Sequence, residues 1–347
     1  MAAAIIRSVP APDQAIVAAL RRMGLAGDEP PAMRPLSGGV SSDIWRVELP
    51  DGPVCVKRAL PRLKVAAVWE VPTRRNRHEW DWLTLASRIL PDRVPRLLGR
   101  DETAGCFAMA YLDPSEYLPW KRELAAGRVD LETATQVGDA LGRVHAATAG
   151  RHEHQTRFAH DAIFAAIRLE PYLLATARRH PAVADRLRTL AERTAETRLT
   201  VVHGDVSPKN ILVGPHGPVF LDAECAWYGD PAFDLAFCLN HLLLKCVWRP
   251  QGREALLEAF DRLSSAYLAH VGWEPTSDHA DRTATLLPAL LLARVDGKSP
   301  VEYLDGPRQA FVRSFAVAEL QRPTASLAEL RRAWNTAVAD TTWEKDA

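Results

Sequence analysis

Three oxygen-bearing side chains stand in one stretch of the chain at spacings that suit phosphoryl transfer. Asp205 follows a His-Gly pair, Asn210 comes five positions later, and Asp222 comes twelve positions after that. A fixed carboxylate can accept the proton of an attacking hydroxyl, while an amide oxygen and a second carboxylate can hold Mg²⁺ on ATP. This pattern predicts Asp205 as the catalytic base and Asn210 and Asp222 as the metal ligands.

Short apolar strands must position these groups. Val201 and Val202 precede the loop, residues 211–213 follow it, and residues 219–221 lead to Asp222. Polar groups on loops that a rigid scaffold anchors are presented with defined geometry. A His-Gly-Asp triplet alone could be a turn, and a lone aspartate could cap a strand end. The joint occurrence of the three groups favours a site.

These residues resemble a known family of enzymes. The run from His203 to Asp222, followed by Tyr-Gly-Asp-Pro-Ala-Phe-Asp-Leu-Ala over residues 228–236, is similar to the aminoglycoside phosphotransferase and choline kinase-like small-molecule kinases. The resemblance extends from about residue 33 to about residue 245. In that family a histidine at the place of His203 supports the catalytic loop, and an aspartate at the place of Asp234 accepts hydrogen bonds from the loop backbone.

The resemblance implies an α+β, two-lobed, protein-kinase-like fold with a small antiparallel β-sheet lobe and a larger, mainly helical lobe. Residues 1–112 are expected to form the nucleotide-binding lobe, with a helix, a five-stranded antiparallel sheet and one further helix. Residues 113–347 are expected to form the helical lobe with the catalytic loop and the substrate pocket. At this length two lobes are more probable than one compact unit.

Hydrophobic periodicity supplies the expected helices. Residues 12–25 place apolar side chains on one helical face, and Asp130 and Asp230 are suited to cap helices, the latter with proline directly after it. Helices are predicted near residues 115–126, 131–149, 160–179, 181–196, 231–247, 251–271, 279–294, 307–320 and 325–338.

A small-residue turn in the first lobe is the expected phosphate-binding segment. Residues 36–49 predict a strand, a turn and a second strand, and the turn contains Gly38, Gly39, Ser41 and Ser42. Glycines let backbone N–H groups approach phosphate, and the two serines can add hydroxyl donors. The segment is not a full Gly-x-Gly-x-x-Gly, and an ordinary hairpin turn is the alternative.

A short β-rich run ending in Lys57 follows this turn. The resemblance implies that Lys57 contacts the α- and β-phosphates and pairs with a glutamate of the next helix. Glu79 is the expected partner, because Leu83 and Ala86 share its helical face and would turn it inward. Glu70 is the alternative, and a surface lysine beside a surface helix is the other interpretation.

The last strand pair of this lobe, residues 96–100 and 106–112, resembles the strand and hinge that read adenine in the family. Backbone contacts to the base are expected at Ala110 and Leu112. Such contacts leave no side-chain signature, so ATP and GTP both fit.

Substrate-binding residues are harder to assign. Glu224 stands where protein kinases have the glycine of Asp-Phe-Gly, so it could assist a metal, touch the substrate or be a solvated acid. Trp227 could wall a sugar or a cation, although an aromatic residue there is more often part of a core. Arg294 begins a polar run that could bind an anionic or sugar group or simply end a helix. Lys209 could neutralise the transferred phosphoryl group.

Composition limits the class of protein. The 43 basic and 43 acidic residues cancel, so nothing suggests a nucleic acid or a membrane surface as partner. The first seven residues are too short an apolar run for a signal peptide, and no segment approaches the length of a membrane-spanning helix, so a cytoplasmic protein is expected. The five cysteines form no C-x-x-C pair and are expected to be reduced.

Only seven residues separate Asp222 from Asp230, which leaves no room for the peptide-docking segment of a protein kinase. The sequence therefore predicts an ATP- and Mg²⁺-dependent enzyme that phosphorylates a hydroxyl group of a small molecule such as a sugar, an amino alcohol or an antibiotic. Two alternatives remain open: a non-catalytic nucleotide-binding module of the same fold, and a protein-modifying kinase.

Overall fold

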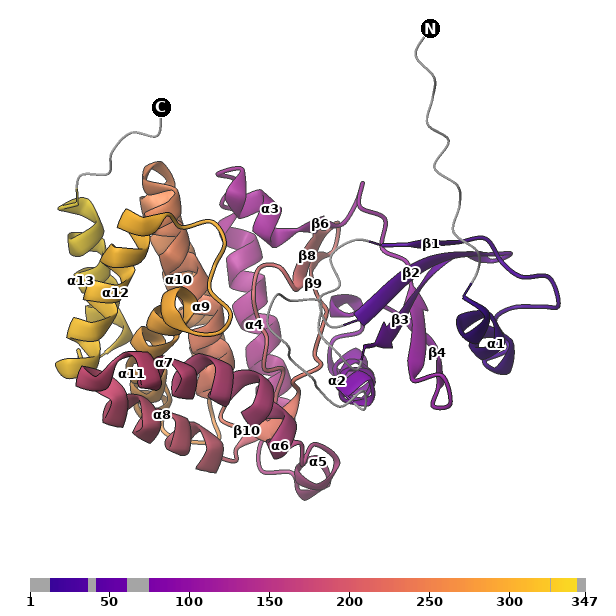
Figure 1. Ribbon diagram of the computed structural model, residues 1–347, viewed down its shortest axis with the longest axis horizontal. Coiled ribbons are helices and arrows are strands. Elements are labelled where there is room, and N and C mark those ends of the chain that lie inside the picture. The colour runs from indigo at the N-terminus through magenta and orange to yellow at the C-terminus, as the bar shows by residue number, and fades with distance from the viewer. Residues whose placement is uncertain (1–12, 37–41, 61–74, 325, 342–347) are drawn as a thin grey trace, which may run out of the picture.

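The computed structural model describes residues 13–36, 42–60, 75–324 and 326–341. A five-stranded antiparallel sheet forms one end of the molecule, and helices form most of the remainder (Figure 1). The order of the strands in the sheet is β1-β2-β3-β5-β4. Their bounds are β1 (Met33–Pro35), β2 (Ser42–Leu49), β3 (Gly52–Ala59), β4 (Leu97–Asp101) and β5 (Cys106–Ala110).

The two faces of this sheet have different partners because successive side chains of a strand point to opposite sides. On β3, Val54 and Val56 pack with the apolar face of α1 (Gln14–Arg22), which Asp13 caps. Cys55 belongs instead to the main core, together with residues of α2 (Arg75–Ile89). Lys57 has the same parity as Cys55, so the alternation turns it towards α2 and the helical part of the chain.

A short hairpin joins β2 to β3 and sets the register that places Lys57. Gly52 has a φ of 113°, a conformation that residues with a Cβ rarely adopt, and it pairs with Leu49. From this turn the antiparallel pairing continues to Ile44 opposite Lys57. β3 lies between β2 and β5, so the backbone that carries Lys57 is held from both sides.

The helical part contains two further small sheets. β7 (Thr200–Val202) pairs with β10 (Trp227–Gly229), and β8 (Ile211–Gly214) lies between β6 (Leu118–Pro119) and β9 (Gly217–Phe220). The helices around them are α3 (Trp120–Ala125), α4 (Leu131–Thr148), α5 (His152–Arg157), α6 (Asp161–Phe164), α7 (Ala175–Arg179), α8 (Ala184–Glu196), α9 (Pro231–Trp248), α10 (Arg253–Leu268), α11 (Thr276–Asp296), α12 (Gly306–Gln321) and α13 (Leu327–Ala339).

The α+β fold class is confirmed, and so are the caps at Asp130 and Asp230. The helix expected from residue 115 begins only at Trp120, because residues 118–119 pair with β8. The first strand lies at Met33–Pro35, just before the position expected from Leu36. The sequence did not predict α5 or β10, which are too short to show a clear period.

The helical run at residues 161–179 is continuous but wider in its middle than an α-helix. Residues Ala165–Leu174 form a π-helical stretch, η2, that contains Pro171. Proline has no N–H to donate and its ring clashes with the preceding turn, so the normal ladder cannot pass through it. Widened turns of this kind are frequent at functional sites.

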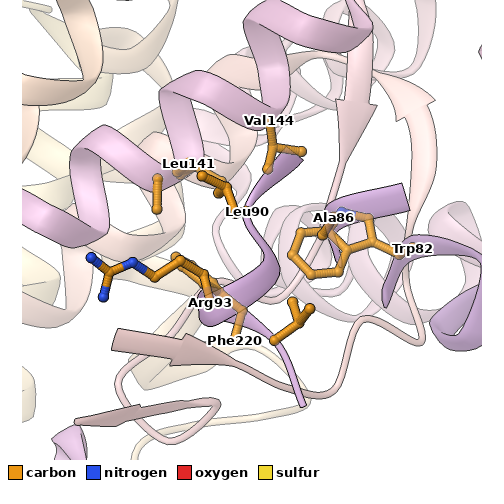
Figure 2. A pocket seen from close by; sticks show the side chains of 9 residues that line it. Trp82, Ala86, Leu90, Arg93, Leu141, Val144 and Phe220 are labelled. Carbon is orange, nitrogen blue, oxygen red and sulfur yellow. The ribbon is translucent and has the colours of Figure 1, made fainter. Parts of the chain in front are cut away.

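A seam of apolar side chains joins the sheet end to the helical part. Figure 2 shows α2 residues facing α4 and Phe220 of β9 around a small pocket. The lining comes from elements far apart in the chain: Trp82, Ala86, Leu90, Arg93, Val94, Ala140, Leu141, Val144 and Phe220. Since most of these residues share one buried core, the seam fixes α2, and with it Glu79, relative to the strand that precedes Asp222.

Within the described parts of the chain, no helix has both the length and the apolar character needed to cross a membrane. The five cysteines are all buried and unpaired, as expected.

Candidate active site

The loop between β7 and β8 brings Asp205 and Asn210 together. The Asn210 side-chain amide donates to Asp205 Oδ2 at 2.8 Å and to the Asp205 carbonyl at 3.0 Å. Arg168 Nη2 and Lys209 Nζ lie 2.9 Å and 3.3 Å from the same Oδ2 atom. No hydrogen bond reaches Oδ1 from the described residues, which leaves this oxygen available to a ligand.

Asp234 fixes the backbone of this loop through hydrogen bonds. Its two carboxylate oxygens accept from the N–H groups of His203, at 2.7 Å, and Gly204, at 2.8 Å. Gly204 has a φ of 78°, and a Cβ there would lie 2.7 Å from the Cys225 carbonyl oxygen, so only glycine fits. The His203 ring is buried and bonds the Leu221 carbonyl at 3.1 Å, which gives it the structural place expected for it.

Asp222 lies two residues after the end of β9, which pairs with β8. The N–H of Leu221 donates to the Asn210 carbonyl at 2.9 Å, so Asn210 and Asp222 occupy neighbouring positions on adjacent segments. Asp222 is the only non-glycine residue with a positive φ, 67°, in the described chain. Asparagine and aspartate tolerate this region better than other residues with side chains.

Lys57 contacts the carboxylates of Glu79, Asp222 and Glu224, and we call these four residues the Lys57 cluster. Its ammonium group lies 2.7 Å from Glu79 Oε2 and 3.2 Å from Glu224 Oε1, and it donates a short hydrogen bond to Asp222 Oδ1. The predicted pairing of Lys57 with Glu79 is therefore present. The Asp222 side chain is 29% exposed while those of Glu79 and Glu224 are 2% and 6% exposed, so Asp222 presents this cluster to the outside.

The charges of the cluster shift its pKa values in opposite directions. Burial alone would lower the pKa of Lys57, but Asp222, Glu79 and Glu224 together raise it well above its usual range. Burial raises the pKa of Glu79 to about 8. Burial also acts to raise the pKa of Asp222, but Lys57 and Lys209 outweigh it and hold that pKa below its usual range. Asp222 therefore ionises more readily than Glu79.

Oxygen donors suited to a divalent cation are present in this cluster. Carboxylate oxygens of Glu79, Asp222 and Glu224 all lie within 4.8 Å of one another. Lys57 already contacts all three residues, so it neutralises the interior of the cluster. The exposed side of Asp222, together with the neighbouring Asn210, therefore fits Mg²⁺ better than the buried pair Glu79 and Glu224 does.

Glu224 is not placed to touch a substrate. Its side chain is buried and accepts from Ser42 Oγ at 2.6 Å and from Arg75 Nε at 2.9 Å. It thereby ties the start of β2 and the start of α2 to the segment after Asp222. The expected role in substrate binding is wrong for this conformation, and the hydroxyl of Ser42 is engaged by Glu224 rather than offered to phosphate.

The remaining nucleotide contacts expected from the sequence have different outcomes. Gly38, Gly39 and Ser41 lie outside the described residues. The N–H of Ala110 donates to the Arg96 carbonyl at 2.8 Å, so a base could be contacted only by the carbonyl of Ala110. Leu112 follows the end of β5, where the chain leaves the sheet for the helical part.

Trp227 is a core residue. Its side chain is 1% exposed, and its ring stacks on Phe164 with the ring centroids 4.2 Å apart. It therefore cannot wall a substrate pocket, which corrects that expectation. Arg294 lies in the last turn of α11 and bonds Ser299 and Tyr172, away from the Lys57 cluster.

Arg168 is the important residue that the sequence did not reveal. It comes from the π-helical stretch η2, is buried, and contacts both Asp205 and the Gly204 carbonyl. Burial would lower the pKa of Arg168, but the nearby Asp205 outweighs it and raises that pKa. Pro171 within an otherwise helical run is the only local signal near it, and it does not identify a partner thirty-seven residues away.

We expect Arg168→Met to lower kcat by roughly 10²-fold, because Asp205 loses the side chain that orients its Oδ2. Unfolding free energy should also fall by about 3–5 kcal/mol, since a buried carboxylate loses its partner. Steady-state rates and thermal denaturation measure the two effects. Arg178→Met is the matched control, because Arg178 is exposed in the same helical run. Unchanged turnover in Arg168→Met would contradict the positioning role.

Comparisons with known proteins bear on the family and the fold of this chain. A model of the phosphotransferase enzyme family matches residues 32–276. Methylthioribose kinase 1 of Oryza sativa subsp. japonica is 24% identical over a match that covers 56% of this chain and 51% of the relative. Methylthioribose kinase of Geobacillus thermodenitrificans is 24% identical over 92% of this chain and 85% of the relative.

For the first of these relatives the chain spans about half of the relative's length. Among solved structures, an amicoumacin kinase in complex with AMP-PNP, Ca²⁺ and its antibiotic has a TM-score of 0.53 at 13% identity. That match covers 92% of this chain and 97% of the other, and it shows a shared fold.

Proposed function

Since this chain belongs to the phosphotransferase enzyme family, we propose that it is an ATP- and Mg²⁺-dependent kinase that phosphorylates a hydroxyl group of a small molecule. One observation carries the proposal. Asn210 joins the two halves of the site, because its side chain binds Asp205 and its carbonyl accepts from Leu221, next to Asp222. A base and two metal ligands therefore share one short stretch of paired backbone.

The chemistry follows from this arrangement. Oδ1 of Asp205 accepts the proton of the acceptor hydroxyl as its oxygen forms a bond to the γ-phosphorus. The bond from that phosphorus to the bridging oxygen breaks, and ADP leaves. Asn210 and Asp222 would hold Mg²⁺, which supplies positive charge to the phosphate oxygens. Lys57, positioned by Glu79, is the protein's own cation for the α- and β-phosphates.

We propose the lobes as the sequence suggests them, with residues 1–112 binding nucleotide and residues 113–347 carrying the catalytic loop and the acceptor pocket. The adenine base would contact backbone groups near Leu112. Gly38, Gly39 and Ser41 are proposed for the phosphates on sequence grounds alone. GTP remains an alternative donor, because backbone contacts would serve either base.

A small molecule is favoured over a protein as the acceptor. Between Asp222 and Asp230 the chain passes directly into β10 and then into α9, so this short segment is already part of a sheet. The named relatives act on methylthioribose, and the structural neighbour is an amicoumacin kinase. These names support a small molecule as the acceptor.

A coupled ADP-release assay against sugars, amino alcohols, hydroxy acids, aminoglycosides and macrolides tests the proposal, with ATP and GTP in parallel. We expect Mg²⁺-dependent ADP release that requires one class of acceptor. Nucleotide binding without acceptor-dependent release across the whole screen would favour a non-catalytic nucleotide-binding module. Transfer of label from ATP to proteins of a lysate would favour a protein-modifying kinase.

A further inference from the structure

A second group of cations lies in the helical part of the molecule, apart from the Lys57 cluster. Lys245, in the last turn of α9, is 1% exposed. Its Nζ atom lies 4.5 Å from the ring centroid of Tyr303 and 5.0 Å from that of Trp248. Among the described residues it has neither a hydrogen-bond acceptor nor a carboxylate within ion-pair distance. A buried ammonium group without an anion is costly, and a helix C-terminus and aromatic faces compensate only part of that cost.

Two neighbouring donors are also left without acceptors. Tyr303 Oη and Arg294 Nε are buried, and neither has a hydrogen-bond partner among the described residues. The other end of the Arg294 guanidinium is fixed, because Nη1 donates to Ser299 Oγ at 3.1 Å and to Tyr172 Oη at 3.3 Å. Buried polar groups of folded proteins are nearly always paired, so unpaired donors at one place indicate a missing acceptor. We name Lys245, Arg294 and Tyr303 the Lys245 cluster.

The surroundings of this cluster are positively charged. Burial, together with the charges of Lys121 and Arg294, lowers the pKa of Lys245 to about 8, against the opposing effect of Glu302. Burial also takes the pKa of His241 well below its usual range, helped by Arg294, Lys245, Lys209 and Lys121. Glu302 is itself paired with Lys121, so it offsets little of this charge.

Packed side chains connect the Lys245 cluster with the catalytic loop. The N–H of Lys121 donates to the Pro208 carbonyl at 2.8 Å. The Arg168 guanidinium, which contacts Asp205, lies over Tyr172, and Tyr172 is the residue that Arg294 bonds. α9 and α11, which carry Lys245 and Arg294, pack against each other on the far side of the loop from the five-stranded sheet (Figure 1). The cluster is thus on the side from which an acceptor, rather than the nucleotide, would approach.

We propose that the Lys245 cluster binds an oxyanion of the phosphate acceptor, so that the acceptor is a hydroxylated molecule bearing a carboxylate or a phosphate group. The inference rests on the proposed function and narrows its substrate class. Three donors lacking acceptors match the several lone pairs of an oxyanion, and charge-assisted hydrogen bonds to an anion are the strong kind. Polycationic aminoglycosides would be repelled by the same charges.

Sulfate binding tests the site without any turnover. We would titrate the Asp205→Asn variant with sulfate, by calorimetry and by the fluorescence of Trp248, with the nucleotide site filled by Mg·AMP-PNP. Lys245→Met should weaken sulfate binding by about 10–100-fold. Arg249→Gln is the matched control, because the Arg249 guanidinium lies 4.9 Å from the same Trp248 ring but Arg249 is exposed. Absence of sulfate binding, or equal binding by Lys245→Met, would overturn the proposal.

Competition experiments then identify the source of the oxyanion. D-glycerate and glycerol phosphate are each added as competitors of bound sulfate, with glycerol as the neutral reference. Stronger competition by D-glycerate assigns a carboxylate, and stronger competition by glycerol phosphate assigns a phosphate. If neither compound competes better than glycerol, the assignment of the cluster to the acceptor is overturned. Failure of Mg·AMP-PNP to bind would count against the proposed kinase function but leave the sulfate result interpretable.

The pH dependence supplies a readout that a purely structural lysine would not give. Sulfate keeps its charge across the neutral range, whereas Lys245 loses its proton as the pH rises through about 8. Affinity should therefore fall above about pH 8 in the parent protein and stay flat in Lys245→Met. The charged and titratable groups around Lys245 are Lys121, His241, Arg249, Arg294, Glu302, Tyr303 and the Asp305–Arg308 pair. A flat profile in both proteins would count against binding by Lys245.

Discussion

Replacement of Asp205 by asparagine is expected to lower kcat by about 10²–10⁴-fold, the range that a positioned general base contributes. The amide has nearly the same shape and can still fill the space between Arg168, Lys209 and Asn210, but it cannot accept the proton of a hydroxyl. Binding of Mg·ATP should change little, because Lys57 and Asp222 are untouched. Single-turnover rates and nucleotide binding by calorimetry separate the two quantities.

The matched control for Asp205 is Asp281→Asn, an identical change at an exposed position of α11. Its rate should equal that of the parent protein. Asp205→Asn protein that keeps full turnover on its acceptor would rule out Asp205 as the base. A loss of nucleotide binding as large as the loss of rate would mean instead that the change had disturbed the loop.

Replacement of Asp222 by asparagine is expected to weaken Mg²⁺ binding in the presence of ATP by more than about 100-fold. Loss of an outer-shell partner of a metal ligand already costs about 10–100-fold, and Asp222 is proposed as a ligand itself. Asparagine is chosen because Asp222 has a φ of 67°, which alanine would tolerate poorly. Initial rates over a range of Mg²⁺ concentrations measure the effect.

The same change should also lower stability. The pKa of Asp222 lies below its usual range because of Lys57 and Lys209, so the folded protein favours the ionised carboxylate, and loss of that charge should lower the thermal midpoint at neutral pH. Glu79→Gln is the matched control, because it also replaces a carboxyl group of the cluster by an amide but does not remove a proposed ligand. Equal shifts of the Mg²⁺ midpoint in both variants would contradict coordination by Asp222.

Local patterns were enough to predict several contacts correctly. Glu79 was expected to meet Lys57 because apolar residues share its helical face, and the two lie 2.7 Å apart. Asp130 and Asp230 cap their helices as their positions before apolar runs predicted. In each case the signal lies within a few residues of the position that it predicts. The same holds for the hairpins β2–β3 and β4–β5 of the five-stranded sheet, whereas β3 pairs with β5 across the intervening α2.

Other assignments failed because their partners are remote in the chain. Glu224 was expected near the substrate, yet its carboxylate bonds Ser42, which precedes it by 182 residues. Trp227 looked available for a ligand, but the pairing of β10 with β7 buries it against Phe164. Nothing adjacent to either residue indicates these neighbours, because burial depends on which elements pack together.

The amino-acid sequence by itself determined most of the helices and the chemical types at Asp205, Asn210 and Asp222, and the resemblance carried by these motifs implied the α+β kinase-like fold. Periodicity, caps and motif spacing act over a few residues, so they can be read locally. The tertiary structure alone decided that Arg168 contacts Asp205, that Glu224 is part of the Lys57 cluster, and that Lys245 lies buried without an anion. The physical reason is that charge and burial depend on distance in space, and packing of α9, α11 and the stretch η2 brings together side chains that no local pattern relates.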